Sequence, residues 1–121
     1  MNNKQIRLLF VDDEKVDQML FERFVKNQNL PYNYILVNSL AKAIDFLKID
    51  QFDIVISDYN LGDGTAFELF PFLSEKVPII IVTGLGNEEI AVQAMKMGAE
   101  DYLIKDDANR HLKTLPIRSN F

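Results

Sequence analysis

Three acidic residues of this 121-residue chain follow apolar stretches of sequence. Asp12 and Asp13 come after Ile6–Val11, and Asp58 closes the stretch that begins at Ile54. An Asp in such a place often only starts a turn or a helix, and for Asp58 taken alone that explanation is the better one. Carboxylates held within a few ångströms of one another instead raise one another's pKa unless a cation lies between them. Hard oxygen ligands with room for water suit Mg²⁺ better than Zn²⁺.

Two further side chains follow apolar stretches in the second half of the chain. Thr83 closes the stretch from Ile79, and Lys105 follows Tyr102–Ile104. Taken singly, Thr83 suits a turn and Lys105 suits a solvated surface position. A hydroxyl and an ammonium beside a metal-bound carboxylate would stabilise a transferring phosphoryl group. The carboxylate itself can then be the nucleophile and become an aspartyl phosphate.

Whether these side chains meet depends on the elements that carry them. Short apolar runs rich in β-branched residues predict five strands, which are Ile6–Val11, Tyr34–Val37, Ile54–Asp58, Ile79–Thr83 and Tyr102–Ile104. Between them, helical spacing and capping residues predict helices from Val16 to about Asn27, after Ser39, from the capping box Thr65–Glu68, and from Asn87 to Gly98. Met95 is expected on the inner face of that last helix, and Met95 and Met97 are expected to fill the core. A weak pattern from Asp106 to Phe121 predicts a final helix that is short or truncated.

Strands that alternate with helices favour a doubly wound α/β fold with a five-stranded parallel sheet. Each connection is long enough for the crossover that parallel pairing requires. The expected strand order is the flavodoxin-like 2-1-3-4-5, with helices on both faces and a switch point between the first and third strands. Asp12, Asp13 and Asp58 would then share one crevice, with Thr83 and Lys105 on the same edge. Helix capping becomes the weaker explanation for the acidic pair.

The composition predicts one domain over residues 1–121 and excludes some functions. A formal net charge of −5 gives no support to nucleic-acid or anionic-membrane binding by this domain. The absence of cysteine fits a reducing cytoplasm. The apolar stretch near the N-terminus is too short for a membrane span.

Four motifs, read together, give the chain a family resemblance. VDDE at 11–14, the apolar strand that ends at Asp58, Thr83 after IIIV, and GAEDYLIK at 98–105 resemble the receiver domain of two-component response regulators. The resemblance covers Ile6 to Lys105. It implies a Mg²⁺-dependent, cytoplasmic signalling module that takes a phosphoryl group from a sensor histidine kinase or a phosphotransfer protein. Such a module catalyses only its own phosphorylation and dephosphorylation, so no turnover enzyme is expected, and a further domain can follow Phe121.

The same resemblance assigns roles to the metal and acceptor residues. Asp58 would be the phosphoacceptor and would also contact the metal. Asp13 would bind Mg²⁺ directly, Asp12 through water, and Asn60 through its backbone carbonyl.

The resemblance also implies a switch. Thr83 would bond a phosphoryl oxygen and Lys105 would pair with the same group. Tyr102 would be the aromatic switch residue, because a Thr83 that turns towards the phosphate leaves space that Tyr102 can fill. The interaction surface near Tyr102 would change as a result.

Two alternatives stay open at this stage. A haloacid-dehalogenase-like phosphatase also uses Asp, Thr, Lys and Mg²⁺, but it places a DxD after the first strand, where this chain has Asp12, Asp13 and Glu14. A binding-only pseudo-receiver would keep the fold without phosphorylation. The complete acidic set argues against this second alternative.

Overall fold

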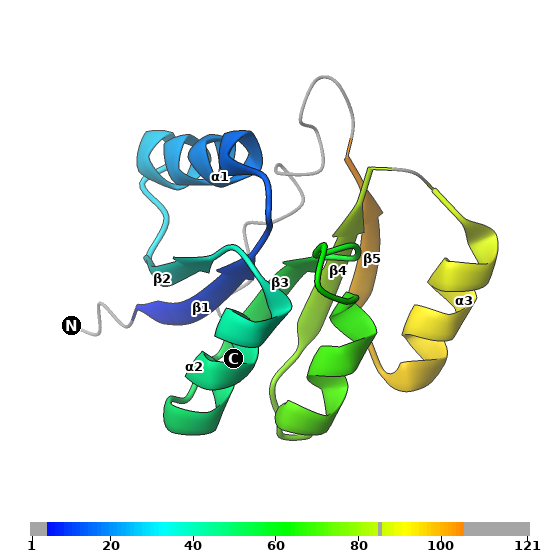
Figure 1. Ribbon diagram of the computed structural model, residues 1–121. Coiled ribbons are helices and arrows are strands. Elements are labelled where there is room, and N and C mark those ends of the chain that lie inside the picture. Colours follow the sequence, from blue (N-terminus) through cyan, green and yellow to red (C-terminus); the bar gives the residue numbers. More distant parts are fainter. Residues whose placement is uncertain (1–4, 85, 106–121) are drawn as a thin grey trace.

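The sheet has the predicted topology. The computed structural model describes residues 5–84 and 86–105, and in it five parallel strands lie in the order β2-β1-β3-β4-β5 (Figure 1). The doubly wound α/β fold and its 2-1-3-4-5 order are therefore confirmed. The predicted final helix and the single-domain boundary at 121 lie outside the described residues. The strands are β1 (Ile6–Val11), β2 (Tyr32–Val37), β3 (Ile54–Asp58), β4 (Ile79–Thr83) and β5 (Asp101–Ile104).

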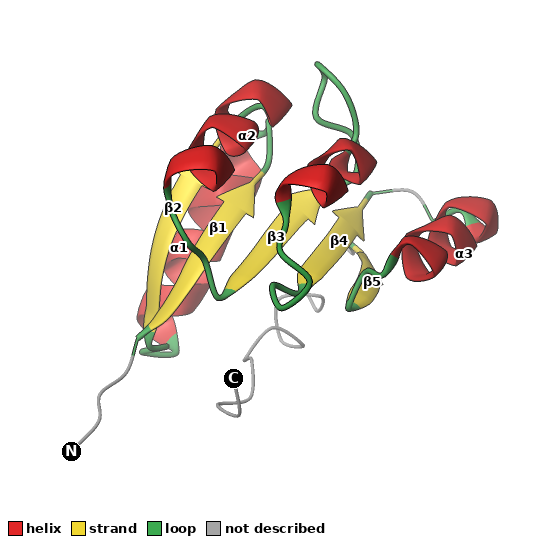
Figure 2. Ribbon diagram, turned by 90° about the horizontal axis from the view of Figure 1, so that it is seen from below, coloured by secondary structure: helices red, strands yellow, loops and turns green. Residues whose placement is uncertain are grey.

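Helices cover both faces of the sheet, and each face has its own apolar core. Figure 2 shows α1 (Lys15–Asn27) behind the sheet, and α2 (Leu40–Ile49) and α3 (Glu88–Met97) in front of it. The 3₁₀ helix η1 (Ala66–Phe72) lies between α2 and α3. Under α1, the ring of Phe21 stacks on that of Phe10 with 4.2 Å between the centroids. The central strands are buried on both faces, as expected for parallel strands between two helical layers.

Capping residues begin and end the helices where the sequence predicts. The Ser39 hydroxyl accepts the backbone N–H of Lys42 at the start of α2, and the Asn87 side chain accepts two backbone N–H groups at the start of α3. Gly98 ends α3 with a φ of 105°, a left-handed conformation that favours glycine. The Ser39 and Asn87 caps fix where the loops that follow β2 and β4 end.

The segment after Thr65 differs from an ordinary helix. The predicted capping box forms, with the backbone N–H of Thr65 donating to the Glu68 carboxylate at 2.9 Å. The segment nevertheless continues only as the short η1, which contains Pro71. Proline has no N–H to donate to the carbonyl four residues earlier, so it opposes an α-helix here.

Two expectations about packing and strand length are corrected. Met95 and Met97 do not fill the core, because their side chains are 51% and 38% exposed while Ala94 is fully buried. The small Ala94 lies against the sheet and turns Met95 outward. Strand β2 starts at Tyr32 rather than at Tyr34, because Tyr32 pairs with Ile6 in the sheet.

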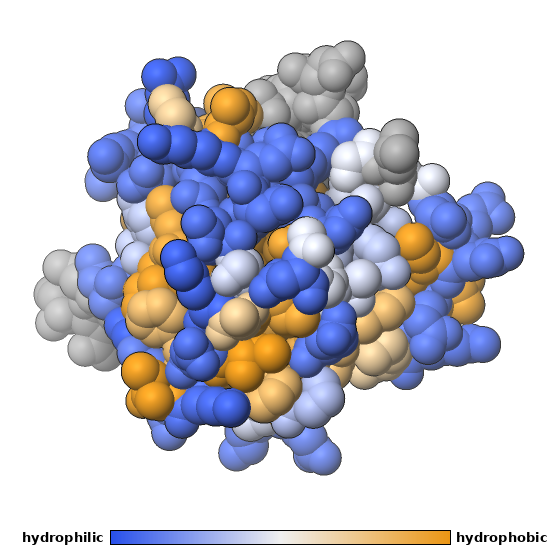
Figure 3. Space-filling model, in the orientation of Figure 1, coloured by the Kyte–Doolittle hydropathy of each residue, from blue (hydrophilic) through white to orange (hydrophobic). Residues whose placement is uncertain are grey.

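The outer surface is mixed in polarity. Low on the face shown in Figure 3, apolar side chains in orange lie among polar ones where α2 and η1 are, and Ile49 and Phe72 are among the exposed apolar residues. Within residues 5–84 and 86–105, no helix has the length and apolarity to cross a membrane.

Candidate functional site

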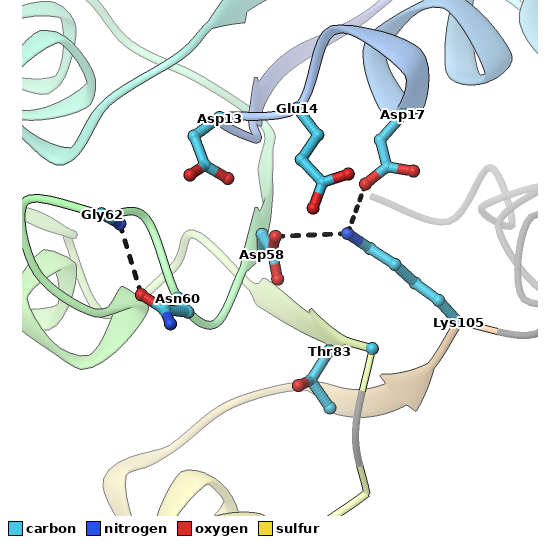
Figure 4. A pocket seen from close by; sticks show the side chains of 9 residues that line it. Asp13, Glu14, Asp17, Asp58, Asn60, Gly62, Thr83 and Lys105 are labelled. Atoms are coloured by element: carbon cyan, nitrogen blue, oxygen red, sulfur yellow. Dashed lines mark hydrogen bonds and ion pairs between the residues drawn. The ribbon is translucent and has the colours of Figure 1, made fainter.

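The predicted side chains gather at the carboxyl edge of the sheet. Val11 at the end of β1 pairs with Ser57 in β3, so Asp12 and Asp58 leave neighbouring strands side by side. They meet at the switch point, where open α/β sheets bind ligands. A pocket of about 500 Å³ opens there, and its lining is shown in Figure 4: Asp13, Glu14, Asp17, Asp58, Asn60, Gly62, Thr83, Gly84 and Lys105.

Lys105 is the cation at the centre of this site. Its Nζ lies 2.6 Å from Asp17 Oδ2, 3.1 Å from Asp12 Oδ2 and 3.2 Å from Asp58 Oδ2. Its backbone N–H donates to the carbonyl of Thr83 at 2.8 Å, which ties the end of β5 to the end of β4. The sequence predicted Lys105 on this edge, and the structure places its ammonium among three carboxylates.

Burial governs the electrostatics of the site. It raises the pKa of Asp12 to about 7, although Lys105 lowers that pKa. Burial also raises the pKa of Asp58, with Lys105 again opposing and neighbouring carboxylates adding to the rise. For Lys105, burial acts to lower the pKa, but the hydrogen bond to Asp17 and the charges of Asp12 and Asp58 raise it overall. One ammonium faces three carboxylates, so the site is short of positive charge.

The donor set fits a hard divalent cation. Oxygen atoms of Asp12, Asp17 and Asp58 lie within 4.8 Å of one another around the Lys105 ammonium, and the Asp12 and Asp58 carboxylates are the two of these that a cation beside Asp13 would share. Carboxylate oxygens are preferred ligands of Mg²⁺ and Ca²⁺, and Mg²⁺ keeps several waters that the open side of the pocket can hold. A bound cation would also lower the pKa of Asp12, which burial raises.

Asp13 and Asn60 lie on the side of the pocket away from Lys105 (Figure 4). Asp13 is exposed and lines the pocket, but it is not one of the three clustered carboxylates. The side-chain oxygen of Asn60 accepts the backbone N–H of Gly62 at 3.3 Å, and Gly62 has a φ of 82°. The side-chain oxygen of Asn60 is therefore used in this turn. The predicted metal contact of Asn60 uses its backbone carbonyl instead.

Thr83 and Tyr102 belong to the two strands beyond Asp58. Thr83 is 9% exposed and lines the pocket. Tyr102 pairs with Ile81 and is half-buried against the core under α2 and η1. The Tyr102 hydroxyl is buried without a hydrogen-bond partner among the residues that the structure describes. In this arrangement the ring points inward, although its hydroxyl forms no hydrogen bond with the described residues there.

Sequence reasoning missed two residues of α1. Asp17 makes the shortest contact with Lys105. No signal in the sequence marks it, because the contact depends on how α1 is turned over the sheet. Gln18 donates from Nε2 to the carbonyls of Asp12 at 2.9 Å and Val37 at 3.1 Å. Gln18 thereby joins α1 to the ends of β1 and β2.

Comparison with known proteins gives one consistent family. The model of the response regulator receiver domain matches residues 8–115. The transcriptional regulatory protein ZraR of Escherichia coli strain K12 is 32% identical over 108 residues, which make up 87% of this chain and 24% of ZraR. The cell cycle response regulator CtrA of Brucella ovis is 28% identical over 103 residues, 83% of this chain and 44% of CtrA. The chain thus spans less than half the length of either relative.

Solved structures agree with this match. A signal receiver domain from Vibrio parahaemolyticus has a TM-score of 0.80 at 28% identity, covering 92% of this chain and 86% of that one. A response regulator from Burkholderia pseudomallei with a phosphorylated aspartic acid, a calcium ion and citrate has a TM-score of 0.78 at 25% identity. The match covers 96% of this chain and 68% of that one. The Mn²⁺-bound form of response regulator Rcp1 shares the fold, with a TM-score of 0.78 at 20% identity. The match covers 92% of this chain and 88% of that one.

Proposed function

Because this chain belongs to the response regulator receiver domain family, we propose that it accepts a phosphoryl group on Asp58. Receiver domains are signalling modules, and here the modified residue would be part of the module itself. The observation that carries the proposal is the position of Asp58, whose Oδ2 lies 3.2 Å from Lys105 Nζ at the mouth of a strand-end pocket. The phosphorylated aspartic acid of the Burkholderia pseudomallei relative supports the same chemistry.

The proposed reaction is phosphoryl transfer to a carboxylate. An oxygen of Asp58 attacks phosphorus and forms the O–P bond, while the bond from phosphorus to the donor's imidazole nitrogen breaks and that nitrogen keeps the electron pair. Lys105 favours the ionised form of the acceptor carboxylate against the effect of burial and then pairs with a phosphoryl oxygen. The Thr83 hydroxyl is the donor proposed for a second phosphoryl oxygen. The protein contributes mainly position and charge.

The proposed cofactor is Mg²⁺, held by the carboxylates of Asp12, Asp13 and Asp58 and by the backbone carbonyl of Asn60. When bound, it would neutralise the charge that builds up on the transferring phosphoryl oxygens. The calcium and manganese ions of two structural relatives support a divalent metal. The grouping of three carboxylates around one ammonium supports it independently.

The proposed output is a change of surface near Tyr102. The buried hydroxyl has no hydrogen-bond partner among residues 5–84 and 86–105, which makes the inward ring costly, by about 1–3 kcal/mol for such a group. An outward ring would regain water, so two positions of Tyr102 can lie close in free energy. A phosphoryl group that draws Thr83 towards it would favour the inward position, and only such a difference can shift the equilibrium.

The proposed partner is a sensor histidine kinase or a phosphotransfer protein in the cytoplasm. The relatives ZraR and CtrA are longer than this chain, which supports further domains in the full protein. Neither nucleic-acid nor membrane binding is proposed for the domain itself.

Intact-mass measurement tests the function. After incubation with a small phosphodonor and Mg²⁺, the chain should gain one phosphoryl group that alkali removes. The gain should fail without Mg²⁺ and in Asp58→Asn, and persist in Asp45→Asn, an exposed carboxylate on α2. No gain in the wild-type chain under any condition would favour a binding-only module.

A further inference from the structure

The α1 carboxylate Asp17 holds Lys105 more closely than either of the other two acids does. The distances from Nζ are 2.6 Å to Asp17, 3.1 Å to Asp12 and 3.2 Å to Asp58. Asp17 belongs neither to the acidic pair after β1 nor to the strand that ends in the acceptor. Figure 4 shows it reaching down from α1 to Lys105 across the pocket from Asp13.

The three contacts use the full donor capacity of the ammonium. A lysine has three N–H donors and no acceptor, and each donor here meets one carboxylate. A phosphoryl oxygen on Asp58 can therefore bond to Lys105 only if one of the three is released. A divalent cation at Asp12 and Asp58 would take over those two carboxylates. Two donors of the ammonium would then be free, and Asp17 would remain as the acid that draws the ammonium towards α1 and away from the phosphoryl group.

We propose that Asp17 is a positioning residue that holds Lys105 in the unphosphorylated site and competes with the phosphoryl group for its ammonium. This inference rests on the proposed phosphorylation of Asp58. Asp17 would thereby weaken the phosphorylated state relative to a site without it. Its partly exposed position, 22% for the side chain, allows Lys105 to leave it for a phosphoryl oxygen.

A neighbouring residue separates this role from a general effect of negative charge. Glu14 lines the same pocket and precedes the same helix, but within the described part of the chain its side chain makes no ion pair with Lys105. Glu14→Gln and Asp17→Asn each remove one negative charge near the first turn of α1. Only Asp17→Asn removes a contact with Lys105.

The test is the affinity for beryllium trifluoride, an anion that adds to a carboxylate as a phosphoryl group does, measured at saturating Mg²⁺ by NMR titration. Asp17→Asn should bind it roughly five- to tenfold more tightly than the wild-type chain, because a neutral amide draws the ammonium towards α1 less strongly than a carboxylate does. Glu14→Gln should change the affinity much less. Asp17→Glu, which restores the carboxylate, should return the affinity towards wild type.

Equal gains in Asp17→Asn and Glu14→Gln would overturn the inference, because charge alone would then explain both. Weaker binding in Asp17→Asn would overturn it as well. Thermal unfolding of each variant separates these results from loss of the fold. The failure of the proposed function looks different, because beryllium trifluoride would then bind neither the wild-type chain nor any variant.

Discussion

The carboxylate of Asp63 accepts the backbone N–H of Leu40 at 2.9 Å, so the loop that follows β3 also caps α2. Its second oxygen accepts the N–H of Ala41 at 3.1 Å. Because these two hydrogen bonds favour the charged form, they lower the pKa of Asp63. The loop beside the acceptor is thus tied to a helix by a titratable group.

A pH-dependent loss of stability follows from this cap. A lowered folded-state pKa gives stability that is fully present above the unfolded pKa, about 4 for Asp, and that is lost as the pH falls through the folded pKa. Asp63→Asn should therefore lower the free energy of unfolding at pH 7, and the difference from wild type should shrink below about pH 4. Urea unfolding from pH 7 to pH 3 measures this, with Asp45→Asn as control. A difference that stays constant over that range would contradict it.

The buried hydroxyl of Tyr102 gives a second expectation. Tyr102→Phe should leave the free energy of unfolding unchanged or raise it by up to about 1 kcal/mol, because it removes a buried hydroxyl that has no hydrogen-bond partner in the described part of the chain. Tyr34→Phe is the matched control, since the Tyr34 hydroxyl donates to Glu22 at 3.0 Å. It should lose roughly 0.5–1.5 kcal/mol. An equal loss in both variants, measured by urea unfolding, would show that the Tyr102 hydroxyl is bonded.

Gln18 gives a third expectation, because its amide joins α1 to two strand ends. Gln18→Ala should lower the free energy of unfolding by about 1–3 kcal/mol, since it removes two hydrogen bonds. Gln93→Ala, at an exposed position of α3, should change it little. Chemical denaturation of the two variants provides the comparison. Equal free energies of unfolding for Gln18→Ala and Gln93→Ala would mean that hydrogen bonds from water replace those from Gln18 without loss.

Much of the site follows from where apolar runs end. Asp58, Thr83 and Lys105 could be placed on one edge because parallel strands share a direction, and each residue closes or directly follows a strand. Asp17 could not be placed in the same way, because its contact with Lys105 depends on how α1 is turned over the sheet. The rotation of α3 about its axis could not be predicted from the sequence pattern either. It places Ala94 in the core and leaves the neighbouring Met95 exposed.

Segment type was predictable only in part. The capping box at Thr65 and Glu68 correctly placed the start of a helical segment. The sequence reasoning did not weigh Pro71, which restricts that segment to a short 3₁₀ helix by removing a backbone donor.

Metal binding gives a fourth expectation. Mg²⁺ should raise the thermal midpoint of the wild-type chain, because a ligand of the folded state stabilises it by mass action. Asp13→Asn should lose most of that gain, since Asp13 is the proposed direct ligand, whereas Asp45→Asn should keep it. Thermal unfolding with and without Mg²⁺ at constant ionic strength measures this. The same Mg²⁺ shift in wild type and Asp13→Asn would remove Asp13 from the proposed metal set.

The position that carries the phosphoryl group decides whether Asp58 is the acceptor. Sodium borohydride reduces an aspartyl phosphate to homoserine, so treatment after incubation with a phosphodonor and Mg²⁺ marks the modified position for peptide mass spectrometry. We expect homoserine at position 58, and its absence there when the donor or Mg²⁺ is left out. Homoserine at position 12, 13 or 17 instead, with Asp58 unchanged, would contradict it.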